Sequence, residues 1–139
     1  MTRNKTFPLF VYGTLKKGYY THDLIKKSKF LGFAYTKKDY KLLSLGSYPG
    51  LIECKNGTNN IEGEVYEIDK EILETTHRYE GVNEGLFSFS FVAIDEFDLT
   101  KSPESNLSKH MINRNLCFGY LFNNQEKKLY PEIERFTLD

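Results

Sequence analysis

Short apolar runs that end at turn-forming residues recur along the chain and predict β-strands. Residues 8–12 (PLFVY) form a run that Gly13 ends, which is the pattern of a buried strand. Residues 61–68 (IEGEVYEI) alternate apolar and charged side chains over much of their length, as a strand with one buried face does. Further runs that predict strands lie at 30–36, 40–45, 51–54, 87–91 and 116–122.

One helix is well marked among these strands. Asp69 can cap a helix that runs from residue 70 to residue 79 or 80, because its carboxylate accepts hydrogen bonds from the first free backbone N–H groups. A weaker pattern at 20–29 indicates a short helix, and the polar stretch 95–115 predicts a long loop. Several short strands interrupted by one helix predict an α+β fold with a curled sheet or small barrel.

Length, charge and cysteine content narrow the class of protein. The 139 residues fit a single domain, 1–139, because two domains would each approach the lower limit for an independent core. Nineteen basic residues balance nineteen acidic ones, so we expect neither nucleic acid nor a membrane as a partner. Cys54 and Cys117 lie outside any metal-binding spacing and are expected to be free thiols in the cytoplasm. The oligomeric state stays open.

Several common chemistries lack the residues that they need. Residues 13–18 have the glycine spacing of a phosphate-binding loop, but two tyrosines follow where Lys and Ser or Thr are required. The histidines have no partner at metal-binding spacing, so we expect them at the surface or behind the site; they are His22, His77 and His110. The sequence therefore predicts an activity without metal or other cofactor.

A turn directly after the first predicted strand is a candidate binding element. Tyr12-Gly13-Thr14-Leu15 places glycine where the chain leaves the strand. Glycine tolerates positive φ and lets backbone N–H groups approach a ligand closely, and consecutive N–H groups of this kind bind anions. The alternative interpretation is an ordinary turn without a ligand.

Glu80 is the candidate for proton transfer. On the predicted helix it lies on the same face as three less polar residues, Ile72, Leu73 and Thr76. A carboxylate on an apolar face is costly unless it is paired or functional, and burial there would raise its pKa. The alternative interpretation is a structural carboxylate that accepts backbone N–H bonds in the turn at Gly81.

Four sequence blocks, in order, resemble the gamma-glutamylcyclotransferase-like family, which includes gamma-glutamylamine cyclotransferases and avirulence-induced-gene-like proteins. The blocks are Tyr12-Gly13-Thr14-Leu15 with Gly18, Ser47-Tyr48-Pro49-Gly50-Leu51, residues 61–69 (IEGEVYEID) and Arg78-Tyr79-Glu80-Gly81. The resemblance covers about residues 7–94, with a weaker echo at 116–122. Two positions depart from the family, because Phe89 replaces a common Arg and His77 replaces a frequent Asp.

The resemblance implies a small mixed β-barrel with flanking helices and an enzyme of transferase or lyase type. Its members release 5-oxoproline and a free amine from a small γ-glutamyl amine or amide, whose own α-amino nitrogen attacks the γ-carbonyl. The protein then needs only to bind, orient and move one proton, with Glu80 as general acid/base. The implied substrate-binding residues are Tyr12, Gly13, Thr14, Leu15, Tyr48, Pro49 and Gly50. The alternative is a non-catalytic module of the same fold that binds a small carboxylate or amine.

Overall fold

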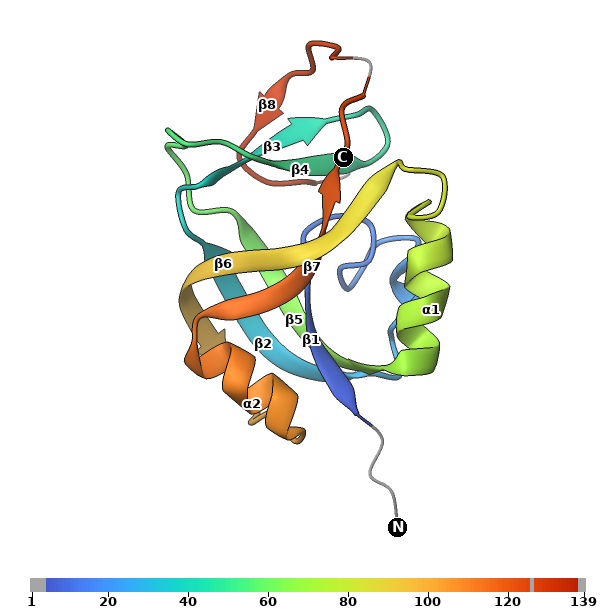
Figure 1. Cartoon of the computed structure of the whole chain (residues 1–139), viewed down its shortest axis with the longest axis vertical. Coiled ribbons are helices and arrows are strands. Elements are labelled where there is room, and N and C mark those ends of the chain that lie inside the picture. Colours follow the sequence, from blue (N-terminus) through green and yellow to red (C-terminus); the bar gives the residue numbers. More distant parts are fainter. Residues whose placement is uncertain (1–4, 126, 138–139) are drawn as a thin grey trace.

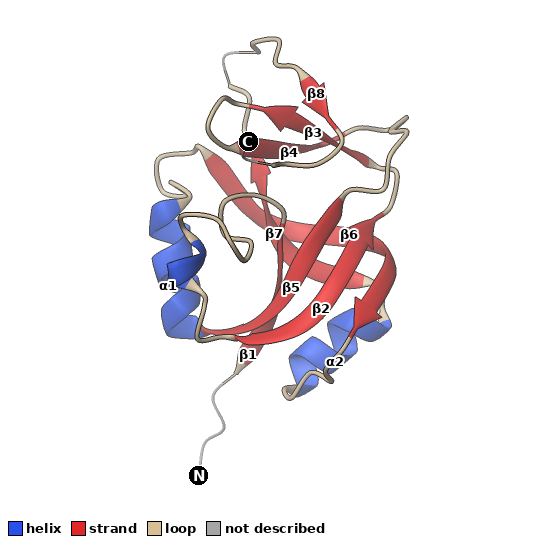
Figure 2. Cartoon of the chain, turned by 180° about the vertical axis from the view of Figure 1, so that it is seen from behind, coloured by secondary structure: helices blue, strands red, loops and turns tan. Residues whose placement is uncertain are grey.

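The computed structural model describes residues 5–125 and 127–137, and strands dominate this part of the chain (Figure 1, Figure 2). The strands are β1 (Thr6–Val11), β2 (Lys29–Thr36), β3 (Tyr40–Ser44), β4 (Pro49–Glu53), β5 (Glu62–Asp69), β6 (Phe87–Leu99), β7 (Leu116–Phe122) and β8 (Glu132–Ile133). The helical elements are the 3₁₀ turn η1 (His22–Leu24), α1 (Lys70–Tyr79) and α2 (Asn106–Asn113). The strands form one sheet in the order β1-β5-β2-β6-β7-β4-β3-β8.

The first five strands of this order close into a barrel. β1 pairs antiparallel with β5 and also lies parallel to β7, where Leu9 faces Phe118. β6 completes the ring, because residues 87–93 pair with β7 and residues 94–99 pair with β2. β4, β3 and β8 extend the sheet from β7 and lie at the top of Figure 1. The predicted α+β fold with a small mixed barrel is therefore confirmed.

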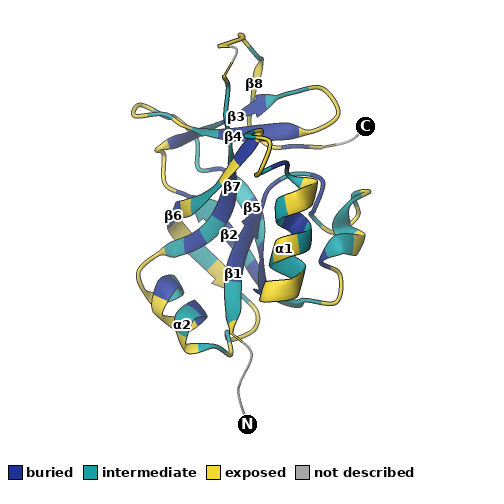
Figure 3. Cartoon of the chain, turned by 45° about the vertical axis from the view of Figure 1, so that its right-hand side comes forward, coloured by how far each residue is buried: buried dark blue, intermediate teal, exposed yellow. Residues whose placement is uncertain are grey.

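Both faces of β1 are buried, in two different apolar clusters. Phe10 belongs to a cluster with members on every barrel strand, which fills the barrel interior. Leu9 and Val11 belong to a second cluster that includes Ile72 and Leu73 of α1, so α1 covers the outer face of the barrel (Figure 3). Burial on both faces explains why the first strand is an apolar run rather than an alternation.

The prediction of the main helix and its cap is confirmed. α1 begins directly after Asp69, whose carboxylate accepts a hydrogen bond from the N–H of Ile72 at 2.8 Å. The weaker prediction at 20–29 is right only in part, because η1 covers His22–Leu24 and the rest of the segment forms turns.

The prediction of a loop over 95–115 is wrong. β6 continues to Leu99, and Phe97 and Leu99 pack against the barrel interior. α2 follows, with Ser105 as its N-cap accepting a hydrogen bond from the N–H of Ser108 at 3.0 Å. The hydrophobic pattern of the sequence did not predict either element, because each buries one narrow face and exposes many polar side chains.

Cys54 is half-buried, Cys117 is buried, and both are free thiols as expected. Within 5–125 and 127–137, the helices are too short or too polar to cross a membrane.

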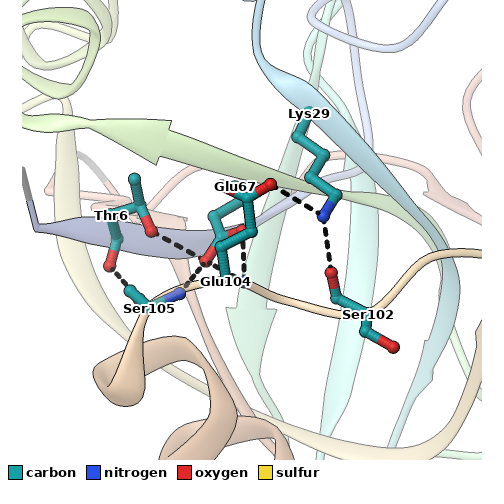
Figure 4. A network of polar contacts seen from close by, with 6 residues as sticks. All are labelled: Thr6, Lys29, Glu67, Ser102, Glu104 and Ser105. Atoms are coloured by element: carbon teal, nitrogen blue, oxygen red, sulfur yellow. Dashed lines mark hydrogen bonds and ion pairs between the residues drawn. The ribbon is translucent and has the colours of Figure 1, made fainter.

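A buried carboxylate ties the start of α2 to the barrel (Figure 4). Glu67 of β5 accepts hydrogen bonds from the Thr6 hydroxyl at 2.7 Å and from the N–H groups of Glu104 at 2.9 Å and Ser105 at 3.0 Å. Burial alone would raise the pKa of Glu67, but the donors at Ser105, Glu104 and Thr6 together hold it below its ordinary value. The ionised form of Glu67 therefore stabilises the fold.

We predict that Glu67→Gln lowers the free energy of unfolding at pH 7 by about 1–3 kcal/mol, because the amide would place its own N–H donors against backbone donors. The folded pKa lies below the unfolded value of 4.5. The contribution is therefore complete above 4.5 and is lost as the pH falls through the folded pKa.

Urea denaturation at several pH values measures this difference in unfolding free energy. Glu104→Gln is the matched control, because Glu104 contacts Glu67 through its backbone N–H while its exposed carboxylate faces Lys29. A difference between wild type and Glu67→Gln that stays constant down to strongly acidic pH would contradict the prediction.

Candidate active site

A cavity of about 230 Å³ lies where the turn after β1, the start of β4 and the end of α1 meet. Its lining consists of Phe10, Val11, Tyr12, Gly13, Thr14, Leu15, Tyr48, Pro49, Tyr79, Glu80, Leu86, Phe87 and Tyr120. All the residues predicted for the site are among them except Gly50. The fold thus gathers three of the four sequence blocks around one space.

Gly50 lies in β4 outside this lining. A Cβ added at Gly50 would lie 2.7 Å from the Cβ of Phe122, so glycine lets β4 pack closely on β7 here. Its position indicates a packing role and gives no support to the substrate-binding role that the resemblance implied.

The hydroxyl of Tyr12 joins three strands beside the cavity. It donates a hydrogen bond to the carbonyl oxygen of Tyr120 at 2.6 Å and accepts one from the N–H of Leu51 at 3.2 Å. Burial, and then the charge of Glu80, raise the pKa of Tyr12, so its hydroxyl stays protonated at neutral pH. Because the hydroxyl is already engaged, Tyr12 shapes the cavity and anchors the following turn.

Gly13 is required by a close approach between two chain segments. A Cβ on Gly13 would lie 2.9 Å from both Cγ and Cδ of Pro49. The φ of Gly13 is not positive, so the close approach to Pro49, and not a left-handed backbone, requires glycine at this residue. The turn is closed by a hydrogen bond from the N–H of Lys16 to the carbonyl of Gly13 at 3.0 Å.

Gly13, Thr14 and Leu15 are consecutive residues of the cavity lining. Among residues 5–125 and 127–137, no acceptor forms a hydrogen bond with their backbone N–H groups. Consecutive free donors of this kind suit an anionic group such as a carboxylate. The segment is therefore both a hydrogen-bonded turn and a possible anion site.

Glu80 occupies the cavity because of how α1 ends. The N–H of Gly81 bonds to the carbonyl of Arg78 at 3.2 Å, and the N–H of Val82 bonds to the carbonyl of His77 at 3.1 Å. These are the two bonds of a Schellman motif, in which the residue after the C-cap is left-handed. Gly81 supplies that conformation with φ of 65°, and Glu80 is the C-cap residue.

The carboxylate of Glu80 has an environment that favours its neutral form. Burial raises the pKa of Glu80 to about 7, as expected from its position on the helix. No donor in the described part of the chain forms a hydrogen bond with this carboxylate. The alternative role, in which Glu80 accepts backbone bonds from the Gly81 turn, therefore finds no support in the structure.

Two tyrosines beside Glu80 were not assigned to the site from the sequence. Tyr79 brings its hydroxyl to 3.4 Å from Oγ1 of Thr14, and Tyr120 brings its hydroxyl to 2.6 Å from Oγ1 of Thr76. Tyr79 stands within the block Arg78-Tyr79-Glu80-Gly81 and could have been found there. Tyr120 had no such signal, because it comes from β7, forty residues later in the chain.

The two residues that depart from the family pattern lie behind the cavity lining. Phe89 stacks on Phe118 with ring centroids 4.7 Å apart, and its ring lies 4.6 Å from that of His77. Nδ1 of His77 lies 2.7 Å from the hydroxyl of Tyr120. Within the described ranges, no group of three His, Cys, Asp or Glu side chains is placed to hold a metal ion.

The chain is similar in sequence to known proteins. The family model described as "Gamma-glutamyl cyclotransferase, AIG2-like" matches residues 9–135. The "Putative gamma-glutamylcyclotransferase" of Vibrio cholerae is 45% identical over 65 residues, which make up 47% of this chain and 54% of that protein. The "Gamma-glutamylaminecyclotransferase" of Bos taurus is 34% identical over 80 residues, 52% of this chain and 48% of that protein. The chain therefore spans about half the length of the curated relatives that it matches.

Solved structures share the fold over nearly the whole chain. An AIG2-like protein from Mus musculus has a TM-score of 0.75 at 20% identity, covering 96% of this chain and 89% of that one. An uncharacterized protein from Pyrococcus horikoshii has a TM-score of 0.64 at 24% identity, covering 92% and 86%. At these low sequence identities, the similarity to the two solved structures supports the fold and nothing more.

We predict that Glu80→Gln is more stable than the wild type at pH 8 and equally stable at pH 4, below the unfolded pKa of 4.5. The folded pKa of about 7 exceeds the unfolded value of 4.5, so ionised Glu80 destabilises the fold. This penalty begins above 4.5 and is complete above the folded pKa. The gap corresponds to at most ~3 kcal/mol, less after solvent screening.

Thermal unfolding between pH 4 and pH 8 measures this change. Glu84→Gln is the matched control, because Glu84 is exposed and lies outside the cavity lining. A Glu80→Gln variant that unfolds more readily than wild type at pH 8 would instead support a structural role for Glu80.

Proposed function

Because the chain belongs to the gamma-glutamyl cyclotransferase, AIG2-like family, we propose that it converts a γ-glutamyl amine or amide to 5-oxoproline and a free amine. One observation carries this proposal. The carboxylate of Glu80, with its pKa raised by burial to about 7, faces the same cavity as the turn at residues 12–15. The two elements together match the needs of an internal cyclisation.

The proposed reaction requires proton transfer but no nucleophile from the protein. The α-amino nitrogen of the substrate forms a bond to its own γ-carbonyl carbon, and the bond from that carbon to the leaving nitrogen breaks. The attacking nitrogen loses one proton, and the leaving nitrogen gains one. Glu80 accepts the first proton and returns it to the leaving nitrogen, so it serves as general base and then as general acid.

The raised pKa of Glu80 makes this transfer less costly. A free Glu and an α-amino group differ by about 3.5 pKa units, so the proton transfer would cost roughly 5 kcal/mol. With the pKa of Glu80 at about 7, the difference falls to about one unit and the cost to roughly 1.4 kcal/mol. Burial of Glu80 thus favours its use as a base near neutral pH.

The remaining walls of the cavity suit the binding of a glutamyl group. The free N–H groups of Gly13, Thr14 and Leu15 would bind the α-carboxylate. Tyr48 and Phe87 line another side with aromatic rings. Confining the flexible arm between these walls would bring the amine close to the γ-carbonyl, and such proximity accelerates cyclisation.

A non-catalytic module that binds a small carboxylate or amine is the second candidate. Phe89, in place of the Arg common in the family, favours this candidate. The position of Glu80 argues against a module that binds only a carboxylate, because such a site gains nothing from a second, unpaired carboxylate whose ionisation destabilises the fold.

Incubation with a panel of γ-glutamyl amides tests the proposal, with release of 5-oxoproline as the measurement. The panel contains amides of alkylamines, of the lysine ε-amino group and of amino acids. We expect turnover of at least one class, and Glu80→Gln should lower kcat by about 10²–10⁴-fold while still binding the substrate. Glu84→Gln should keep the wild-type rate. Binding of these amides without any release of 5-oxoproline would favour the non-catalytic module.

We also predict that kcat/KM falls as the pH drops below about 7, by up to tenfold per pH unit, because only ionised Glu80 accepts a proton. A profile of kcat/KM from about pH 5 to about pH 9 measures this limb. An acid limb centred near 4.5, the ordinary pKa of a glutamate, would contradict the assignment of a buried Glu80 as the base.

A further inference from the structure

Two hydrogen bonds connect α1 with β7 next to the cavity, and a third lies within α1. The hydroxyl of Tyr120 lies 2.6 Å from Oγ1 of Thr76 and 2.7 Å from Nδ1 of His77. The hydroxyl of Thr76 donates to the carbonyl oxygen of Leu73 at 2.9 Å. Of the three connected side chains, that of Tyr120 lines the cavity together with Glu80.

The network has two possible directions, because the single hydroxyl proton of Thr76 can go to the carbonyl oxygen of Leu73 or to the hydroxyl oxygen of Tyr120. In the first direction, Tyr120 donates its own proton to Thr76, and no proton remains for His77. The bond between His77 and Tyr120 then requires a proton on Nδ1 of His77.

The surroundings of His77 keep its ring uncharged and fixed. Burial lowers the pKa of His77, and the charge of Glu74 opposes this effect only in part. The ring of His77 stands edge-on to those of Phe89 and Tyr120, at centroid distances of 4.6 Å and 5.5 Å. In the first direction, His77 near neutral pH is thus a neutral imidazole whose one ring proton is on Nδ1.

We propose that His77 is a positioning residue that holds the oxygen of Tyr120 as a hydrogen-bond acceptor for the α-amino group of the substrate. This inference rests on the proposed function, because it requires a ligand with an α-amino group in the cavity. Tyr120 gives its proton to Thr76, so its oxygen offers the cavity an electron pair and no proton. An amine N–H is the group that satisfies such an acceptor.

The arrangement orients the substrate by polarity. Burial, and to a lesser extent the charge of Glu80, raise the pKa of Tyr120, so its hydroxyl stays neutral and keeps its bond to Thr76. A carboxylate placed here would meet the lone pairs of Tyr120 and the charge of Glu80. This wall therefore selects the amine of the glutamyl group, while the N–H groups at residues 13–15 suit its carboxylate.

Nitrogen NMR of the His77 ring tests the direction of the hydrogen bond without any ligand. At about pH 8 we expect the tautomer with the proton on Nδ1, and Tyr120→Phe should shift its population toward the Nε2–H form. A wild-type ring protonated only on Nε2 would overturn the inference, whatever the enzyme activity.

A pair of ligands tests the acceptor role of Tyr120. The probes are γ-glutamyl methylamide and N-methylglutaramic acid, which is the same molecule without the α-amino group. Calorimetry in the Glu80→Gln background avoids turnover during the measurement. We expect Tyr120→Phe to weaken binding of the first ligand by roughly tenfold and to leave binding of the second within about twofold. An equal change for both ligands, or no change for either, would overturn the inference.

Two substitutions of similar size test the contribution of His77. His77→Asn can place an amide N–H near the position of Nδ1, whereas His77→Leu has no donor. We expect His77→Asn to keep the preference for the amine-bearing ligand within about twofold and His77→Leu to reduce it by at least about threefold. Equal preferences for the amine-bearing ligand in the two variants would show that His77 only packs against its neighbours, which would overturn the inference. Failure of both ligands to bind even with Tyr120 and His77 intact would instead refute the proposed function.

Discussion

The closing of the barrel through β1 is the constraint on which the site depends. A strand of six residues must pair with β5 along one edge and meet β7 along the other, so its end cannot move independently of either neighbour. The buried hydroxyl of Tyr12 extends this restraint to β4, because it bonds to β7 and to Leu51 together. The turn that follows is thereby held against Pro49, and within residues 5–125 and 127–137 the N–H groups of Gly13, Thr14 and Leu15 have no acceptor.

The end of α1 is a second rigid element, and it places the carboxylate of Glu80 in the site. Gly81 ends α1 in a Schellman motif, which defines the direction in which the chain leaves the helix and leaves Glu80 at the helix terminus. Apolar side chains packed around Glu80 then desolvate its carboxylate, and the described part of the chain supplies no hydrogen-bond donor to it. Unpaired buried charge reduces stability, and such local costs are characteristic of functional sites. The fold tolerates this one because two apolar clusters and the Glu67 network support the barrel elsewhere.

Much of this arrangement was readable in the sequence, because the signals concerned are local. Apolar runs marked most strands, Asp69 marked the start of α1, and three of the four short blocks marked the lining at Tyr12–Leu15, Tyr48, Pro49 and Glu80. The segment 95–115 was misread because β6 and α2 each bury a narrow face under many polar residues. No local pattern distinguishes such half-exposed elements from a loop.

The sequence by itself determined most of the strands, where α1 begins and ends, and which carboxylate lies on its apolar face, because periodicity, capping and glycine placement act over a few residues. Only the tertiary structure decided which side chains share the cavity. Tyr120 reaches Thr76 and His77 across the space between β7 and α1, and Gly50 turns out to pack beneath Phe122. Barrel closure sets these contacts, because strand register brings together residues whose separation along the chain carries no information about their proximity.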